Sequence, residues 1–321
     1  MREPAKKRLR KRYNEYFTST TVNKDGLVDK KYQYLPLRDE KTMDKFIEIS
    51  SVYSKYKENP IICLGRSPKW FLNTSLWMKD GIEDYRFVAF SGFWHRPDPV
   101  EGLVRMDRFA PKPEEIKEYR KYLKSVKADP KTIVDHMKKT GKETVITDYI
   151  HSSKGACSFL EVMGEYAKDL GILEEFSKSI RIVGIGSREY MEEMNPYAES
   201  ISDPRVVMPK VLWPYEKNIK QEYHNMDYRV FSEILLNQNA NECRSTYYPS
   251  QAWTIYKPDK FKTGLIKDLN KVKEVVKLLP FDKSLTSFSP VMRDYRNLLN
   301  FRILDSLDAR KLLKTTFKSK V

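Results

Sequence analysis

Residues 143–163 read ETVITDYIHSSKGACSFLEVM. A run with β-branched apolar residues comes first and leads to Asp148, a short polar loop follows, and apolar residues then recur at helical spacing. The pattern predicts a strand over 143–150, a loop, and a helix that ends near Gly171, since glycine commonly terminates helices. What a loop of small polar residues binds at this position is the question that the rest of the sequence has to answer.

The same alternation of strand and helix signals recurs on both sides of this stretch. Strand-like runs occupy 60–64, 86–94 and 179–186, and apolar residues at helical spacing occupy 41–57, 116–126 and 265–279. Residues 206–213 are an edge-strand candidate, because Pro209 cannot donate a ladder hydrogen bond. Strand, loop and helix in this order predict an α/β fold with an open, mainly parallel sheet flanked by helices and right-handed crossovers.

The chain divides into three predicted parts. Residues 1–40 form a basic N-terminal arm and lead-in, and residues 41–190 form the α/β core. Residues 191–321 are a C-terminal extension, partly helical, which we expect to pack on the core. Parallel sheets bind ligands at the carboxyl ends of their strands, so the polar loops at 65–69, 93–98 and 152–155 are the candidate sites.

The composition is strongly basic, with 59 Lys and Arg against 44 Asp and Glu, a formal net charge of +15. Such a surface attracts polyanions such as nucleic acid or phosphorylated small molecules. A lysine-rich solubilising surface is the alternative, and it stays open. The segment from Arg2 to Arg12 holds seven basic residues and one acid, which is typical of a nuclear-import patch, a phosphate contact or a solvated terminus.

The sequence predicts an intracellular protein, cytoplasmic or nuclear. No apolar run approaches the roughly 18 residues of a membrane span, and the basic N-terminus has no apolar core of a secretory signal. The three cysteines lie far apart, which fits a reducing compartment and excludes a C-x-x-C zinc pair.

The loop at 152–155 has the chemistry of a phosphate site. Small residues that open a helix expose unpaired backbone N–H groups backed by the positive end of the helix dipole. The hydroxyls of Ser152 and Ser153 and the charge of Lys154 add donors, and Gly155 lets the backbone approach closely. In a different fold, the serine loop would be only a helix cap.

At these residues the sequence resembles the type I phosphoribosyltransferase signature. Residues 145–147 look like its strand, Asp148 like its first acid, and residues 152–156, which end at Ala156, like the loop that holds the 5′-phosphate of phosphoribosyl pyrophosphate. Upstream, Gly65, Arg66, Ser67, Pro68 and Lys69 follow an apolar run and look like the family's pyrophosphate loop. The resemblance covers about residues 55–190, and residues 95–142 correspond in position to a long, helical flap insertion.

The sequence departs from the family pattern at three positions, and one of them is Lys154, which stands where a glycine is common. Tyr149 replaces the second acid, which weakens contact with the ribose hydroxyls or their magnesium. Ala156 replaces a hydroxyl residue, which removes a phosphate donor.

The resemblance implies a mechanism as well as a fold. Gly65, Arg66, Ser67 and Lys69 would bind pyrophosphate, and Asp148 would bond a ribose hydroxyl and act as general base. Mg²⁺ would be held mainly by the substrate's own oxygens, without direct protein ligands. A homodimer is common in this family.

Other residues are weaker candidates. His95 and Arg96 follow a strand end and would cover pyrophosphate, or form only the turn that Pro97 requires. Ser187 and Arg188 follow another strand end and would contact the acceptor. Aromatic residues interleaved with cations suit either base stacking or the core; they are Trp70, Phe71, Trp77, Trp94, Trp213, Tyr247 and Tyr248.

The leading interpretation is a phosphoribosyltransferase-like protein that binds a phosphorylated ribose or nucleotide and that, if it is active, transfers the phosphoribosyl group. The alternative keeps the fold without the chemistry, as a basic module that binds nucleic acid or a protein partner. A different fold with a nucleic-acid role is the third. The sequence does not identify the acceptor.

Overall fold

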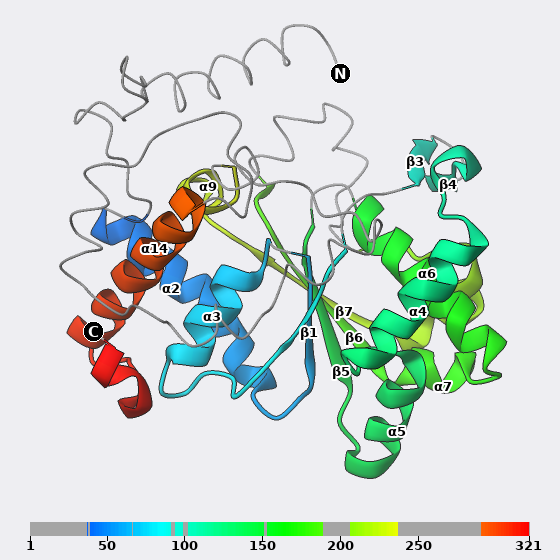
Figure 1. Cartoon of the computed structure of the whole chain (residues 1–321), viewed down its shortest axis with the longest axis horizontal. Coiled ribbons are helices and arrows are strands. Elements are labelled where there is room, and N and C mark those ends of the chain that lie inside the picture. The colour runs from blue at the N-terminus through cyan, green and yellow to red at the C-terminus, as the bar shows by residue number, and fades with distance from the viewer. Residues whose placement is uncertain are drawn as a thin grey trace, which may run out of the picture.

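The computed structural model describes residues 37, 39–65, 67–90, 94–98, 102–150, 153–188, 206–236 and 290–320. Its centre is a 5-stranded sheet in the order β2-β1-β5-β6-β7, in which every neighbouring pair is parallel (Figure 1). The strands are β1 (Ile61–Leu64), β2 (Arg86–Val88), β5 (Thr144–Tyr149), β6 (Ile180–Gly186) and β7 (Lys220–Asn225). The predicted α/β class with an open parallel sheet is therefore confirmed.

The strand order reverses between β1 and β5. The chain passes from β1 to β2 at one edge of the sheet, then returns to β5 on the other side of β1 and continues outward to β6 and β7. In open sheets of this kind, the loops on the two sides of the reversal diverge and leave a crevice at the carboxyl ends of the strands.

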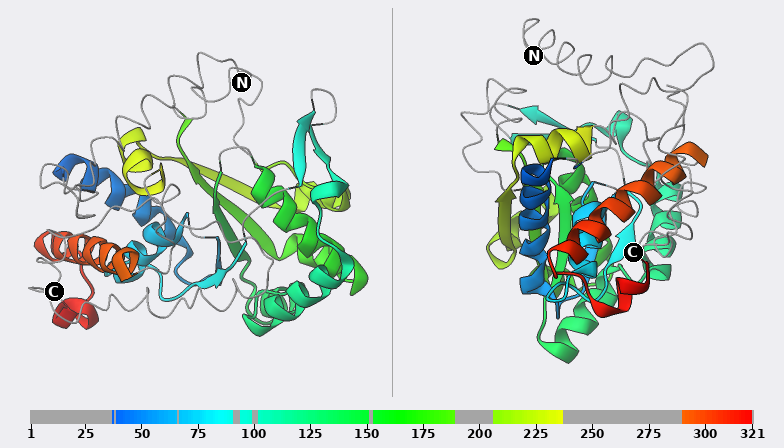
Figure 2. Two further views of the ribbon diagram at one scale, coloured as in Figure 1. Left: turned by 45° about the horizontal axis from the view of Figure 1, so that its top comes forward. Right: turned by 90° about the vertical axis from the view of Figure 1, so that its left-hand side faces the viewer.

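Helices cover both faces of the sheet (Figures 1 and 2). One face carries α2 (Glu40–Ser51), α3 (Lys69–Trp77), α9 (Tyr228–Val230) and α14 (Pro290–Ala309). The other carries α4 (Pro113–Ser125), α5 (Pro130–Thr140), α6 (Lys154–Asp169) and α7 (Leu173–Lys178). Strand β1 shows why: Ile61 and Cys63 belong to the first core cluster and Ile62 and Leu64 to the second, as a strand buried on both faces requires.

The shorter elements complete the chain. They are the turns of 3₁₀-helix η2 (Val52–Tyr56), η3 (Asp107–Phe109), η5 (Lys210–Asn218) and η7 (Thr315–Lys320), the π-helix η6 (Phe231–Leu236), and the antiparallel hairpin of β3 (His95–Asp98) and β4 (Gly102–Arg105). Within the described ranges, no helix combines the length and the hydropathy needed to cross a bilayer.

The predicted flap region 95–142 is mostly a packed layer. Tyr119 and Leu123 of α4 and Ile133 and Val134 of α5 are buried in the second core cluster. These helices form the crossover from β2 to β5. Among the described residues of this region, the β3–β4 hairpin stays the candidate for a flap.

Two predictions for the C-terminal third need correction. The edge strand comes from Lys220–Asn225, beyond the predicted 41–190 core, and residues 210–218, which overlap the 206–213 candidate, form a 3₁₀-helix instead of a strand. Both Pro209 and Pro214 lack the N–H that a paired strand would need. The predicted helix at 265–279 lies outside the described residues.

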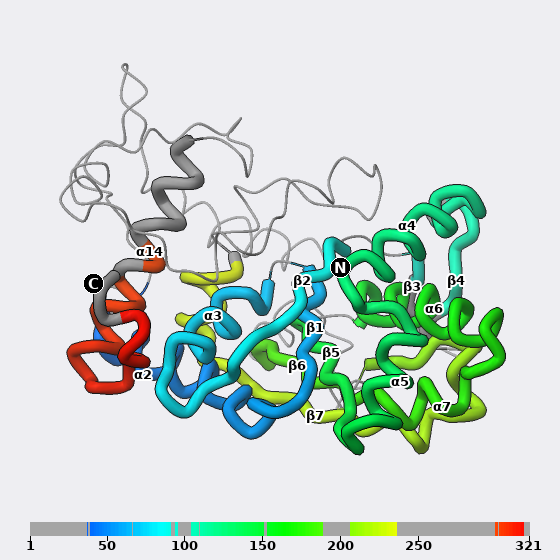
Figure 3. Tube along the Cα trace, turned by 60° about the horizontal axis from the view of Figure 1, so that its bottom comes forward, coloured from blue at the N-terminus to red at the C-terminus, as the bar shows by residue number. Residues whose placement is uncertain are grey.

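The C-terminal segment closes the first face of the sheet. Leu299, Ile303, Leu304 and Leu307 of α14, followed by Leu313, are fully buried in the cluster that contains α2 and α3. Figure 3 shows this segment beside α2, although the two lie far apart in the sequence. Backbone bonds from Lys79 N–H to Leu312 O and from Lys314 N–H to Trp77 O fix the segment to the end of α3.

Candidate functional site

The loops after β1 and β5 leave the same edge of the sheet from neighbouring strands. In the parallel register Cys63 lies opposite Thr147, and one residue further along each strand come Leu64 and Asp148. The sequence predicted loops at these two strand ends, and the strand order places both of them at the reversal point. The two strand ends that carry the predicted phosphate loops are thus adjacent.

The loop after β1 is held tightly against β2. Gly65 has a φ of 66°, and a β-carbon there would lie 2.8 Å from the carbonyl oxygen of Phe90. Its N–H donates to Val88 O at 2.9 Å. Only glycine combines this backbone conformation with this close approach. Arg66 lies outside the described residues, and Ser67 is half-buried.

Lys69 brings a cationic side chain to the same edge. It is the first residue of α3, a helix of 9 residues that are all buried, and its side chain is only 3% exposed. The Lys69 ammonium lies 5.1 Å from the ring centroid of Trp70. A lysine is seldom buried to this degree unless its charge has a partner, and Lys69 lies at the start of a helix beside the loop.

The loop after β5 opens α6, a helix of 16 residues. Ser153 precedes the helix with a φ of 57°, a conformation that costs a non-glycine residue energy. Ser153, Lys154 and Gly155 are half-buried, whereas Ala156 is buried. Ser152 lies outside the described residues. The first N–H groups of α6 therefore begin at a partly open turn, as an anion site requires.

Asp148 lies between the sheet and this helix. Its Oδ1 accepts the N–H of Tyr149 at 2.8 Å, and its Oδ2 lies 3.9 Å from the position of a β-carbon on Gly155. Burial raises the pKa of Asp148 to about 8, although the hydrogen bond from Tyr149 opposes the shift. A carboxyl group with a pKa near 8 is mostly protonated at neutral pH, and it can accept a proton, as a general base does, in its ionised fraction.

Tyr149, which stands where the resembled family has its second acid, faces the other side of the sheet. Its ring stacks on Phe231, with centroids 5.4 Å apart and an interplanar angle of 19°. Asp148 alone of this pair of residues is directed toward the start of α6.

The side chain of His95 is buried and contacts other side chains of the protein. Its side chain is 4% exposed, with Nδ1 2.9 Å from Ser158 Oγ and Nε2 3.2 Å from the carboxylate of Glu161. These contacts attach the base of the β3–β4 hairpin to α6, one to two turns beyond the loop. The side chain of Arg96 lies outside the described residues.

Glu161 is a residue with several polar contacts that the sequence pattern did not indicate. Burial opposes its ionisation, but hydrogen bonds from His95, Trp94 and Arg105 outweigh burial and lower its pKa. Trp94 Nε1 and Arg105 Nη1 each donate to it at 2.7 Å. Its sequence signal is only a position one turn after Ser158 on the buried face of α6.

Ser187 and Arg188 lie at the carboxyl end of β6, the next strand. Ser187 is 1% exposed, and its Oγ has no hydrogen-bond partner in the part of the chain that is described. Arg188 is exposed, its N–H donates to Asn225 Oδ1 at 2.8 Å, and its guanidinium lies 5.9 Å from the ring centroid of Tyr223. Both residues belong to the same edge as the two loops, displaced by one strand.

No cluster of three metal-ligating side chains occurs among the described residues. The predicted magnesium, held by a substrate's oxygens, does not depend on such a cluster. Comparison with protein-family models, curated proteins and solved structures returns no match.

Proposed function

We propose that this chain is a phosphoribosyltransferase-like protein that binds a phosphorylated ribose or nucleotide, of which phosphoribosyl pyrophosphate with Mg²⁺ is the model ligand. One observation carries the proposal: the loops after β1 and β5 are adjacent at the reversal of strand order, and the second opens the long helix α6. A phosphate group on α6 and a second anionic group on the loop after β1 would span this edge.

In this proposal the two loops bind different groups of the same ligand. Ser152, Ser153, Lys154 and Gly155 hold the 5′-phosphate, with the backbone N–H groups of α6 as the main donors. Arg66, Ser67 and Lys69 hold the pyrophosphate, and Asp148 bonds a ribose hydroxyl between them. Departure of pyrophosphate leaves positive charge on the anomeric carbon, and a nucleophile whose proton passes to Asp148 adds there. Magnesium, held by the ligand's own oxygens, would supply charge neutralisation for the leaving group.

A second candidate is a non-catalytic module that binds nucleic acid through the basic surface. The net charge of +15 and the loss of the second acid at Tyr149 favour it. Base stacking has less support, since Trp70, Phe71, Trp77 and Trp94 are buried. Trp213 is 48% exposed, and Tyr247 and Tyr248 lie outside the described residues.

A calorimetric titration with phosphoribosyl pyrophosphate and Mg²⁺ tests the proposal on matched variants of one helix. Lys154→Met removes a cation at the start of α6, and Lys168→Met removes an exposed one near its end. We expect the first to weaken binding by roughly tenfold and the second to leave it unchanged.

Equal effects of the two substitutions, or no heat with the wild-type protein, would contradict the proposal. A parallel titration with single- and double-stranded nucleic acid over a salt series tests the second candidate. Steeply salt-dependent binding of nucleic acid without a sugar-phosphate response would support that candidate instead.

A further inference from the structure

Leu37, the first residue that the structure describes, has a strained backbone in a buried position. Its φ is 60°, and its side chain is fully buried in the cluster formed by α2, α3 and α14. A leucine in the left-handed region persists only where its surroundings hold it there, and such residues are concentrated at switches and clamps.

Side chains from two distant segments hold this backbone. The N–H of Leu37 donates to Glu233 Oε2 at 2.8 Å, in a buried hydrogen bond across 196 residues of sequence. Its carbonyl oxygen accepts from Arg302 Nε at 3.1 Å, across 265 residues. The backbone N–H and the backbone carbonyl of Leu37 are thus both bonded to charged side chains, the first to Glu233 of η6 and the second to Arg302 of α14.

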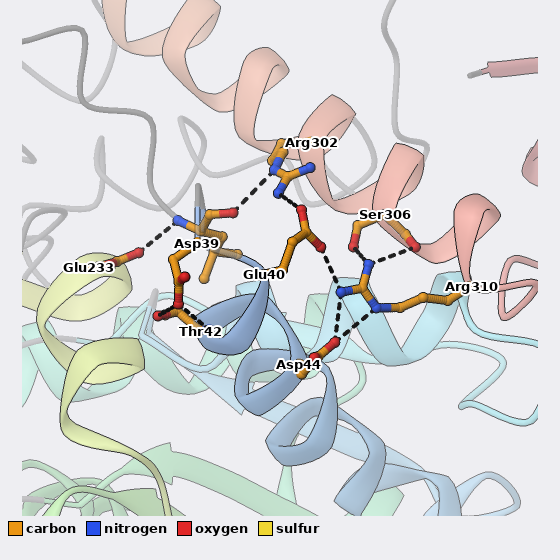
Figure 4. A network of polar contacts seen from close by, with 9 residues as sticks. Asp39, Glu40, Thr42, Asp44, Glu233, Arg302, Ser306 and Arg310 are labelled. Atoms are coloured by element: carbon orange, nitrogen blue, oxygen red, sulfur yellow. Dashed lines mark hydrogen bonds and ion pairs between the residues drawn. The ribbon is translucent and has the colours of Figure 1, made fainter.

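Arg302 ties this position to the docking of the C-terminal helix (Figure 4). Its Nη2 donates to Glu40 Oε1 at 2.5 Å, and the other oxygen of Glu40 accepts from Arg310 at 2.7 Å. Arg310 also contacts Asp44 at 2.6 Å. Two arginines therefore bridge the first turns of α2 to the C-terminal segment, and Arg302 is the one that also bonds the Leu37 carbonyl.

Glu233 ties the same position to the rim of the candidate site. It lies in the π-helix η6, a rare geometry that recurs at functional sites. Phe231, at the start of η6, stacks on Tyr149 at the end of β5, the residue after Asp148. A continuous set of contacts thus runs from α14 through Leu37 and η6 to the carboxyl end of β5.

We propose that Leu37 is a conformational latch that couples the docking of α14 to the conformation of η6 and of the β5 rim. Coupling of this kind is reciprocal: loosening α14 loosens η6, and loosening η6 loosens α14. The alternative is a set of independent packing contacts, in which each loss stays local.

Hydrogen exchange of the full-length protein without ligand tests the latch. Arg302→Met leaves the Leu37 carbonyl without its partner, and we expect exchange to quicken by roughly tenfold in α14, in residues 228–236 and at the end of β5. Glu233→Leu leaves the Leu37 N–H without its acceptor, and we expect faster exchange in residues 299–309 as well as in η6. Arg310→Met is the matched control, because it removes the ion pairs to Glu40 and Asp44 and the bonds to Ser306 of α14 but spares Leu37.

The proposal fails if the effect of Arg302→Met stays within α14, if that of Glu233→Leu stays within η6, or if Arg310→Met loosens η6 as strongly as Arg302→Met does. Should either variant not fold, Arg302→Lys and Glu233→Gln keep a partial hydrogen bond and are expected to give the same pattern at smaller size. Because the measurement needs no ligand, its outcome is separate from that of the phosphoribosyl pyrophosphate titration.

Discussion

The two acids near opposite ends of β5 lie in opposite electrostatic environments, which shift their pKa values in opposite directions. Glu143, just before the strand, accepts from Arg181 Nε at 2.8 Å and from Lys220 Nζ at 2.7 Å. Burial opposes its ionisation, yet these partners prevail and lower its pKa. Asp148, at the carboxyl end, has no ion pair within the described part of the chain, and burial raises its pKa to about 8.

The difference distinguishes a structural acid, Glu143, from a candidate site residue, Asp148, within one region of β5. At the amino end the protein neutralises its own acid with cations from β6 and β7. At the carboxyl end it holds an acid beside a helix N-terminus and lets burial disfavour the charge. A group kept in this state gains most from a ligand that bonds it, so the carboxyl end is where ligand chemistry is expected.

Asp148→Asn is expected to give the largest effect, seen as a change in the pH dependence of stability. The folded protein keeps Asp148 protonated up to about pH 8, whereas an unfolded aspartate ionises near its ordinary pKa of 3.8. The folded state therefore binds more protons in this window, and wild-type stability should fall as pH rises through it. The asparagine variant should lose this slope and gain, relative to wild type, up to a few kcal/mol, discounted because the side chain is half-buried.

Urea unfolding at several pH values between 4 and 8 measures this difference. Parallel curves for the two proteins would show that Asp148 has an ordinary pKa and would remove the contrast with Glu143.

Gly65→Ala should destabilise the fold by about 2 to 3 kcal/mol. A β-carbon would combine a positive φ with a contact 2.8 Å from a backbone oxygen. Gly141→Ala is the control, because Gly141 has a φ of 71° but no atom of the described residues within 4 Å of the β-carbon position. It should cost about 1 kcal/mol, the conformational part alone. If thermal unfolding shows equal losses of stability for the two variants, the backbone at Phe90 must shift to accommodate the β-carbon at position 65.

Glu143→Gln should destabilise the protein by about 1 to 2 kcal/mol, since it leaves Arg181 and Lys220 with a neutral partner. The Glu143 side chain is 13% exposed, so the pairs are partly desolvated. Glu58→Gln removes an exposed pair with Lys142 and should change the free energy of unfolding very little. Chemical denaturation at neutral pH compares them, and a Glu143 effect no larger than that of Glu58 would contradict the structural role.

Ser153→Gly should have the smallest effect, a gain of less than about 1 kcal/mol. Glycine adopts the φ of 57° without the β-carbon penalty, and its greater freedom when unfolded offsets part of the gain. If the serine hydroxyl binds phosphate, the same variant should weaken ligand binding while its melting temperature holds or rises. A clear loss of stability would show instead that Ser153 serves the fold.

The sequence predicts the sheet well where strands are buried and poorly where they are not. The strands at 61–64, 144–149 and 180–186 are short apolar runs that end at a turn, and all three are confirmed. Strand β7, KQEYHN, has no such run, because an edge strand can use charged side chains, here Lys220 with Glu143 and Glu222 with Arg181.

The candidate site is predicted in part for a related reason. Loops at strand ends can be read from the chain, but their adjacency depends on strand order, which local pattern does not encode. The burial of His95 against Glu161 depends on a contact across 66 residues of sequence, so no local signal could distinguish a packed histidine from a ligand-facing one.

The position of α14 has a consequence for synthesis of the chain. The apolar surface of α2 and α3 is covered by residues 299–313, so it stays uncovered until these residues have been synthesised. Until then a growing polypeptide on the ribosome exposes that surface to water, so it cannot finish folding step by step from its N-terminus. Chaperones that bind apolar segments have this whole interval in which to engage it.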